Sequence, residues 1–416
     1  MHSSAAAVIK GRPGQTRKPG IFGTAVGAFG VTAIMGVLAV VLQVLGQRSP
    51  HLGPGYSGWA EAAAESPVAA ARWLLGDMTE PLFYKSDLAA LGLLAGAGLS
   101  WWIGRRRGRV ERGRDKRGGG LGPWILASAS LSLLLSNLAF GWMLDDGWQP
   151  TFVPFVCVAP AMVILYGPGW RTCITGAVLG AATVTPLALI FIPTVASPLG
   201  LPPVAANVLA MSVGSVLAFL VARRLPWLDL HEPGLQPERN LPTSGINRTV
   251  LGEAPWADAL WADALWAARR VIRDFTETHF IAKGLASVGM ISGAAVAYIL
   301  DPGLPAYGTN LLPHILFAQA LTSAIGVVLW RGCYLNEGWV ATYASVVSVA
   351  PAAVLATGGS WSGVVGGAIL GAVLAPPLAR AFSAKLPADF HPVIGNTAAM
   401  AVSTAVTLPL LGLLPA

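Results

Sequence analysis

Charge is scarce in this sequence. Only 11% of its 416 residues are charged, whereas 54% are hydrophobic. Soluble domains carry roughly 25% charged residues, so the composition excludes an ordinary water-soluble protein. Lipid leaves helices and closed barrels as the only spanning structures, and the apolar runs here are continuous rather than alternating. The sequence therefore predicts an all-α membrane protein.

Cysteine is rare as well. The three cysteines show no metal-ligand spacing (Cys157, Cys173 and Cys333), which argues against a disulfide framework or a zinc site. The sequence also lacks a Gly-x-Ser-x-Gly elbow and a phosphate-binding loop. We therefore expect no metal, no cofactor and no enzymatic activity. An enzyme built around His279 or His391 ranks third among the functional alternatives.

The basic residues follow the predicted topology. The net charge of +7 does not indicate nucleic-acid binding, because Lys and Arg gather in the loops between apolar stretches. With a cytoplasmic N-terminus, all of them except Arg48, Arg72 and Lys85 fall in inner segments. The positive-inside rule then predicts a multi-pass protein of the bacterial plasma (inner) membrane, with an extracytoplasmic C-terminus.

Eleven apolar stretches are predicted to cross the membrane, because about twenty such residues span roughly 30 Å of hydrocarbon. They lie near 20–46, 86–104, 122–143, 152–167, 172–192, 203–222, 283–300, 311–330, 339–356, 362–381 and 392–413. Two further stretches, near 56–78 and 255–276, are amphipathic and carry Trp and Arg, which favour the headgroup layer. We predict that both lie on the membrane surface, at opposite faces.

The chain contains an internal repeat. Residues 71–97 match 268–294 at 11 of 27 positions, 144–188 match 335–379 at 20 of 45, and 203–213 match 392–402 at 6 of 11. Each copy holds five predicted spans, and an odd number means that the second copy enters the bilayer from the opposite face. Inverted repeats recur in transporters and channels, with the solute path between the copies.

This repeat divides the chain into four parts. Residues 1–55 form the N-terminus and first span, 56–222 the first repeat, 223–255 a cytoplasmic linker, and 256–416 the second repeat. The predicted fold is thus about eleven transmembrane helices, namely one N-terminal span plus two inverted five-helix repeats.

An Asp-x-Thr-Glu-x-x-Phe element precedes a span in each copy. It places Asp77 and Glu80 in the first copy and Asp274 and Glu277 in the second. Helix capping explains these residue types, because acids favour helix N-termini. The functional alternative is an acidic vestibule at each mouth of a solute path.

Other polar residues fall inside predicted spans, where buried polar groups are costly and are functional candidates by default. Asn207 and Asn396 occupy equivalent positions in the last span of each copy, and the remaining candidates lie in another pair of equivalent spans (Gln319 and Thr322 in the second copy, Ser128 and Ser132 in the first). Hydrogen bonding between helices is the competing interpretation for all of them.

Two resemblances follow from particular segments. The loop 335–339 (LNEGW) and the element 390–396 (FHPVIGN) resemble an uncharacterised bacterial family of polytopic membrane proteins, which implies no activity. More loosely, the 5 + 5 plan resembles urea transporters, through the segments Glu80-Pro-Leu-Phe83 with Leu88, Asn336-Glu-Gly338 and Leu201-Pro202-Pro203. Ala206-Asn207-Val208 replaces the Thr-x-Pro-Phe ending of that family, and an extra N-terminal span is present. This resemblance therefore implies architecture and not substrate.

The sequence favours a channel or transporter for a small polar solute. The expected partners are the lipid bilayer and that solute, with no nucleic acid, and a homo-oligomer is compatible with the pattern. The alternative is a non-transporting membrane subunit that binds a partner protein through its basic cytoplasmic loops.

Overall fold

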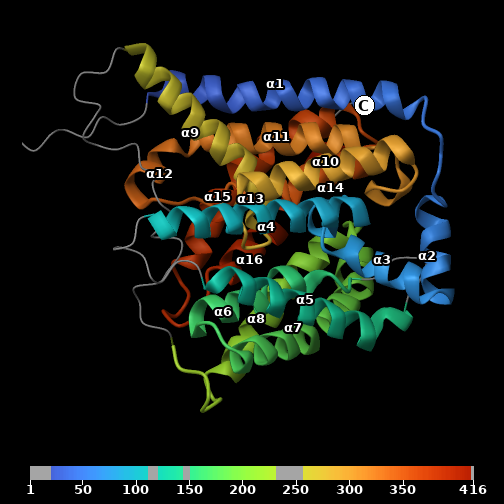
Figure 1. The fold of residues 1–416 in the computed structure, drawn as a ribbon, viewed down its shortest axis with the longest axis vertical. Coiled ribbons are helices and arrows are strands. Elements are labelled where there is room, and N and C mark those ends of the chain that lie inside the picture. Colours follow the sequence, from blue (N-terminus) through green and yellow to red (C-terminus); the bar gives the residue numbers. More distant parts are fainter. Residues whose placement is uncertain (1–19, 111–119, 144–149, 231–255, 414–416) are drawn as a thin grey trace, which may run out of the picture.

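The described part of the chain is helical, with no strand. The computed structural model describes residues 20–110, 120–143, 150–230 and 256–413. Most of the 223–255 linker and both ends of the chain lie outside these residues. The long helices run side by side in one direction and form a bundle (Figure 1).

Within the described residues, eight helices are long and apolar enough to cross a membrane. They are built on α1 (Ile21–Gly46), α4 (Asp87–Val110), α5 (Leu121–Phe140), α7 (Trp170–Phe191), α8 (Pro203–Ala222), α11 (Leu312–Leu329), α15 (Gly367–Ser383) and α16 (Val393–Gly412). Their outward faces carry apolar side chains such as Phe22, Ile34 and Val37 on α1. A face of this kind is unfavourable in water and stable in lipid, so the bundle is compatible with a multi-pass membrane protein.

Three of the eleven predicted spans fall on shorter apolar helices, at Val153–Tyr166, Gly284–Leu300 and Tyr343–Ala356. At about 1.5 Å per residue, the 17 residues of α10 (Gly284–Leu300) extend about 25 Å. The hydrocarbon core is about 30 Å thick. Helix length alone therefore supports eight spans, and the count of eleven stays a prediction.

Two of these short segments, in the predicted spans 152–167 and 339–356, are broken helices. The first consists of η3 (Val153–Val156) and α6 (Val158–Tyr166), and the second of α13 (Tyr343–Val346) and α14 (Val349–Ala356). The residues at the breaks, Cys157 and Ser348, are equivalent in the repeat and share non-helical angles (φ −139°, ψ −91° and φ −133°, ψ −81°).

A proline three residues after each break explains its position. Pro160 and Pro351 have no N–H for the carbonyl four residues earlier. At the break itself, the Cys157 thiol donates to the Val153 carbonyl over 3.1 Å and the Ser348 hydroxyl to the Ala344 carbonyl over 2.6 Å. The same break thus recurs at the same repeat position.

The helices α4 and α10 lie side by side (Figure 1), and paired glycines bring their backbones into close contact. A Cβ on Gly92 would lie 2.0 Å from the Gly289 carbonyl oxygen, and one on Gly289 would lie 2.2 Å from the Gly92 oxygen. Gly96 faces Leu285, while Gly293 faces Leu88. The two helices therefore run antiparallel. Each contact between a residue of α4 and a residue of α10 is repeated by the equivalent residues with the two helices interchanged.

The two amphipathic stretches differ from each other. The first forms α2 (Gly55–Glu65) and α3 (Pro67–Asp77), at one end of the bundle (Figure 1). The second forms the single helix α9 (Trp256–Glu277), which slopes from the opposite end toward the middle. Trp261 on α9 is exposed, but Arg270 and Asp274 are buried. The last turns of α9 therefore pack inside the bundle, and the placement of both stretches at the membrane surface stays a prediction.

Candidate functional site

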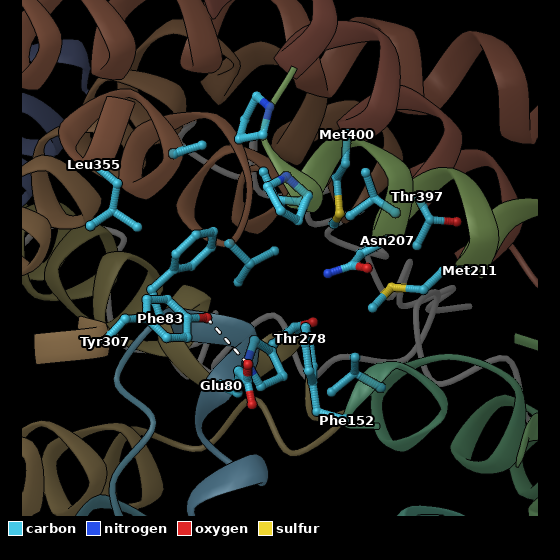
Figure 2. A pocket seen from close by; sticks show the side chains of 18 of the residues that line it. Glu80, Phe83, Phe152, Asn207, Met211, Thr278, Tyr307, Leu355, Thr397 and Met400 are labelled. Carbon is cyan, nitrogen blue, oxygen red and sulfur yellow. Dashed lines mark hydrogen bonds between the residues drawn. The ribbon is translucent and has the colours of Figure 1, made fainter. Parts of the chain in front are cut away.

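A cavity of about 500 Å³ lies between helices of the two sequence copies (Figure 2). Segments near η1 (Glu80–Leu82) and η3, together with α8, line it from the first copy. The segments after α9 and near η8 (Ala306–Gly308), together with α13, α14 and α16, line it from the second. Its volume falls within the range of about 300–1,000 Å³ that is common for pockets holding small organic molecules.

Equivalent residues of the two copies face this cavity in pairs. Phe152 pairs with Tyr343, Val156 with Val347, and Met211 with Met400. The first two pairs lie just before the broken-helix positions, and the third lies on α8 and α16. Equivalent positions of the two copies therefore contribute to opposite parts of the same cavity wall.

The Asp77–Glu80–Lys85 cluster borders the cavity in the first copy. The Lys85 ammonium donates to the Glu80 carboxylate over 2.8 Å and also bonds Asp77. Asp77 accepts two more bonds of 2.9 Å, from the Asn137 amide and the Thr151 hydroxyl. Asp77 and Lys85 are 0% exposed and Glu80 is 1% exposed. These groups form a buried ion cluster, because a buried charge needs a partner charge and hydrogen bonds.

A tight loop after α3 makes the cluster possible. Phe83 and Lys85 take left-handed backbone angles (φ 67° and 42°), which turn the chain back so that Lys85 reaches the end of α3. The equivalent residues of the second copy, Phe280 and Ala282, share this conformation (φ 58° and 46°). Non-glycine residues seldom adopt it, so its recurrence reflects a common local fold.

A second cluster, Arg270–Asp274–Glu277, occupies the corresponding place in the second copy. The Arg270 guanidinium donates to Asp274 over 2.6 Å and also bonds Glu277. Ser323 donates to Asp274 over 2.5 Å, and the Trp339 indole bonds Glu277. Glu277 does not line the cavity, whereas Glu80 does. The two equivalent acids therefore have different surroundings.

The cations of the two clusters come from different positions in the repeat. Arg270 corresponds to Trp73, and Lys85 corresponds to Ala282. In the first copy the Lys85 ammonium lies 3.9 Å from the centre of the Trp73 ring. Each acid pair is thus bound by one cation in a similar place. The residues that supply the two cations lie twelve positions apart in the repeat alignment.

The two aspartates of the acidic element act as ion-pair partners, whereas Glu80 lies in the first turn of η1 and lines the cavity. Asp77 ends α3 and Asp274 lies in the last turn of α9, so neither is at the helix N-terminus that capping requires. Both are fully buried and ion-paired, so neither lines an open vestibule. The sequence analysis did not identify Lys85 and Arg270 as the partners of these acids. The available signal was that each acid pair has a basic residue within eight positions of it.

The two asparagines have different surroundings. Asn207 lines the cavity and points into it from α8, across from Thr278 and Glu80 (Figure 2). Its side chain is buried, and its Oδ1 has no hydrogen-bond partner among the described residues. Asn396 lies outside the lining, and its amide donates to the Tyr343 hydroxyl over 3.0 Å. The Asn396 Oδ1 also has no partner among the described residues, so the two asparagines differ in that Asn207 lines the cavity and Asn396 does not.

Gln319 is engaged with its neighbours. Its amide nitrogen donates to the carbonyl oxygens of Leu82 and Val346 over 3.2 and 3.0 Å. Its Oε1 accepts from the Tyr84 hydroxyl over 2.8 Å. All of these contacts link the two copies or neighbouring helices, so Gln319 holds the bundle together away from the cavity wall.

The hydroxyl candidates also bond between helices. Ser132 donates to the Ala177 carbonyl and Thr322 to the Ala368 carbonyl, each over 2.9 Å. Ala177 and Ala368 are equivalent in the repeat. Ser128 bonds the carbonyl oxygens of α6 and α7 over 3.1 and 3.0 Å. The competing interpretation, interhelical bonding, accounts for these residues.

The histidines and acids of the predicted inner face do not form a metal site among the described residues. Burial lowers the pKa of His279 to about 4 and that of His391 to about 3, so both are neutral near pH 7. Asp389 instead pairs with Arg223 at the surface, and these hydrogen bonds lower the pKa of its carboxyl group.

Comparison with known proteins adds no family to this description. No protein-family model matches the chain, and no curated protein matches it significantly. The architecture and the site therefore rest on the sequence and the geometry above.

Proposed function

We propose that the protein is a membrane channel or transporter that moves a small polar solute along the interface of two inverted repeats. The observation that carries this proposal is the cavity between the copies, lined by equivalent residues from both. Solute sites of inverted-repeat transporters lie at such an interface, often beside discontinuous helices. The breaks at Cys157 and Ser348 lie next to the paired lining residues.

The packing of the copies supports their inversion. The antiparallel crossing of α4 and α10 exchanges equivalent residues, as a twofold axis in the membrane plane would require. Two oppositely facing halves give a solute similar approaches from either side. The membrane is the bacterial plasma membrane in this proposal, with the N-terminus in the cytoplasm.

Solute flux through liposomes containing the full chain tests the proposal. The panel comprises urea, amides, polyols, ammonium, organic cations and anions. Met400 faces the cavity and Val402 is exposed on the outside of the same helix, 3% and 40% accessible respectively. We expect Met400→Trp to fill the cavity and reduce flux at least about tenfold, whereas Val402→Trp leaves it within about twofold.

Two results would contradict the proposal. One is impermeability of wild-type liposomes to the whole panel. The other is a flux that Met400→Trp and Val402→Trp change equally, since the solute would then not pass through this cavity.

A further inference from the structure

One wall of the cavity combines aromatic rings with a carboxylate. We propose that the cavity binds a small organic cation, with Glu80 supplying the opposite charge and Tyr56, Phe83 and Tyr307 the aromatic surface. This inference rests on the proposed function, because it names the class of solute for the same cavity.

The three rings form a continuous surface. The Tyr307 ring centre lies 5.6 Å from that of Tyr56 and 6.2 Å from that of Phe83, with interplanar angles of 83° and 81°. All three residues line the cavity. The Tyr307 hydroxyl also donates to Glu80 over 3.4 Å, which joins the aromatic surface to the acid. Aromatic faces attract cations, most strongly where water is excluded.

The charge of the neighbouring cluster favours a cation. It holds two carboxyl groups, on Asp77 and Glu80, and one ammonium, on Lys85. Glu80 is the member of this cluster that lines the cavity. A cation in the cavity would lie beside the Glu80 carboxylate and be attracted by it. The same cluster already places a cation against an aromatic ring, at Lys85 and Trp73.

Asn207 adds a polar group to the cavity wall. Its amide lies at the cavity from α8, with the nitrogen turned toward the cavity (Figure 2). The amide nitrogen is a donor, so a hydroxyl oxygen on the solute could accept a hydrogen bond from it.

The rest of the wall favours an organic cation over a metal ion. Met211, Met400, Val156 and Val347 offer methyl and thioether groups rather than oxygen ligands. Hard cations need about six oxygen ligands to replace their water. A cation with an apolar body, such as a quaternary ammonium, loses little hydration and packs well against such groups.

Choline and its neutral isostere, in which a quaternary carbon replaces the nitrogen, test the proposal directly. They have the same shape and hydroxyl group but differ in charge. Binding to the full chain in nanodiscs is measured by calorimetry. We expect choline to bind at least about tenfold more tightly than the isostere, because only choline gains the Glu80 charge and the aromatic faces.

Glu80→Gln and Glu277→Gln form a matched pair of variants. Each leaves one acid paired with one base in its cluster, and thermal unfolding of each checks its folding. We expect Glu80→Gln to weaken choline binding at least about tenfold and Glu277→Gln, whose acid lies outside the cavity, to change it less than about threefold. Tyr307→Phe should keep most of the binding and Tyr307→Leu should lose it, because the ring face is the binding group.

Equal binding of choline and the isostere, no choline binding, or equal effects of the two glutamine variants would overturn the proposal. Choline that binds with the expected selectivity but does not cross liposomes would keep this site and reject transport. Flux of neutral solutes without charge selectivity would keep transport and reject the cation site.

Discussion

Lys85 and Arg270 hold equivalent acid pairs from different sequence positions, and at the residue scale this exchange is the clearest consequence of the repeat. Lys85 reaches back across the left-handed loop after α3, whereas Arg270 lies one helical turn before Asp274 on α9. Removing either base would take away the cation that pairs with two carboxylates inside the bundle. The loss of one partner of a buried ion pair costs about 3–5 kcal/mol.

We therefore expect Lys85→Ala to destabilise the protein by about 3–5 kcal/mol. Adding Trp73→Arg to this variant copies the arrangement of the second cluster into the first, and it should restore at least half of the lost stability. Unfolding in detergent, followed by denaturant titration, measures the difference. Lys385→Ala, at an exposed position, is the control and should stay within about 0.5 kcal/mol.

If the double variant is no more stable than Lys85→Ala, the two clusters are not spatially equivalent. The sequence alone showed the acids, because the repeat aligned them. It did not reveal their role, because their burial and pairing depend on a loop with left-handed backbone angles. No local sequence pattern predicts those angles.

At the scale of elements, the crossing of α4 and α10 depends on the absence of side chains. The carbonyl oxygens of Gly92 and Gly289 occupy the space that a Cβ on the opposite glycine would need. Small residues at such crossings allow close backbone packing in membrane helices. At two other glycines of α4, Gly98 and Gly104, an added Cβ would have no neighbour within 4 Å among the described residues.

We expect Gly92→Ala and Gly289→Ala to destabilise the protein by about 1–3 kcal/mol, the usual cost of overpacking. Gly98→Ala is the matched control and should be neutral or stabilising by up to about 1 kcal/mol, because it removes chain freedom without a clash. Thermal unfolding in detergent compares the three variants. Equal effects at Gly92 and Gly98 would show that the helices do not cross at this point.

Glycines four residues apart, Gly92 and Gly96 on α4 and Gly289 and Gly293 on α10, form a sequence pattern typical of close helix packing, and the structure has these glycines at the contact. The broken helices were less accessible to prediction. A proline inside an apolar span, such as Pro160 or Pro351, is compatible with either a kink or a break, and the outcome depends on where the freed carbonyl groups find partners.

At the scale of the whole molecule, the proposed topology predicts which positions face the outside of the cell. Leu52 and Leu413 should lie on the extracytoplasmic side, and Lys385 in the cytoplasm. All three are exposed, with Leu413 at 81%. In Figure 1, α1 begins at the end of the bundle near α12 (Arg331–Glu337) and leads to α2 at the other end, as an N-terminal crossing requires.

Single cysteines at these positions test the topology, in a chain whose half-buried Cys333 is changed to Ser. Cys157 and Cys173 are buried and remain. A membrane-impermeant maleimide should label Leu52→Cys and Leu413→Cys in intact cells, but Lys385→Cys only after lysis. Protection of Leu413→Cys in intact cells would place both copies in the same orientation and remove the basis of the solute path.

The sequence by itself determined the solvent and the repeat. Low charge and long apolar runs require lipid-facing helices whatever their arrangement, and matched Trp, Pro, Asp, Glu and Asn identify the two copies. Only the tertiary structure decided which polar residues reach the cavity. Ser128, Gln319 and Thr322 look like Asn207 in sequence, because all are polar residues in apolar helices. They differ in whether a carbonyl group of a neighbouring helix lies within reach, and that depends on contacts between segments far apart in the chain.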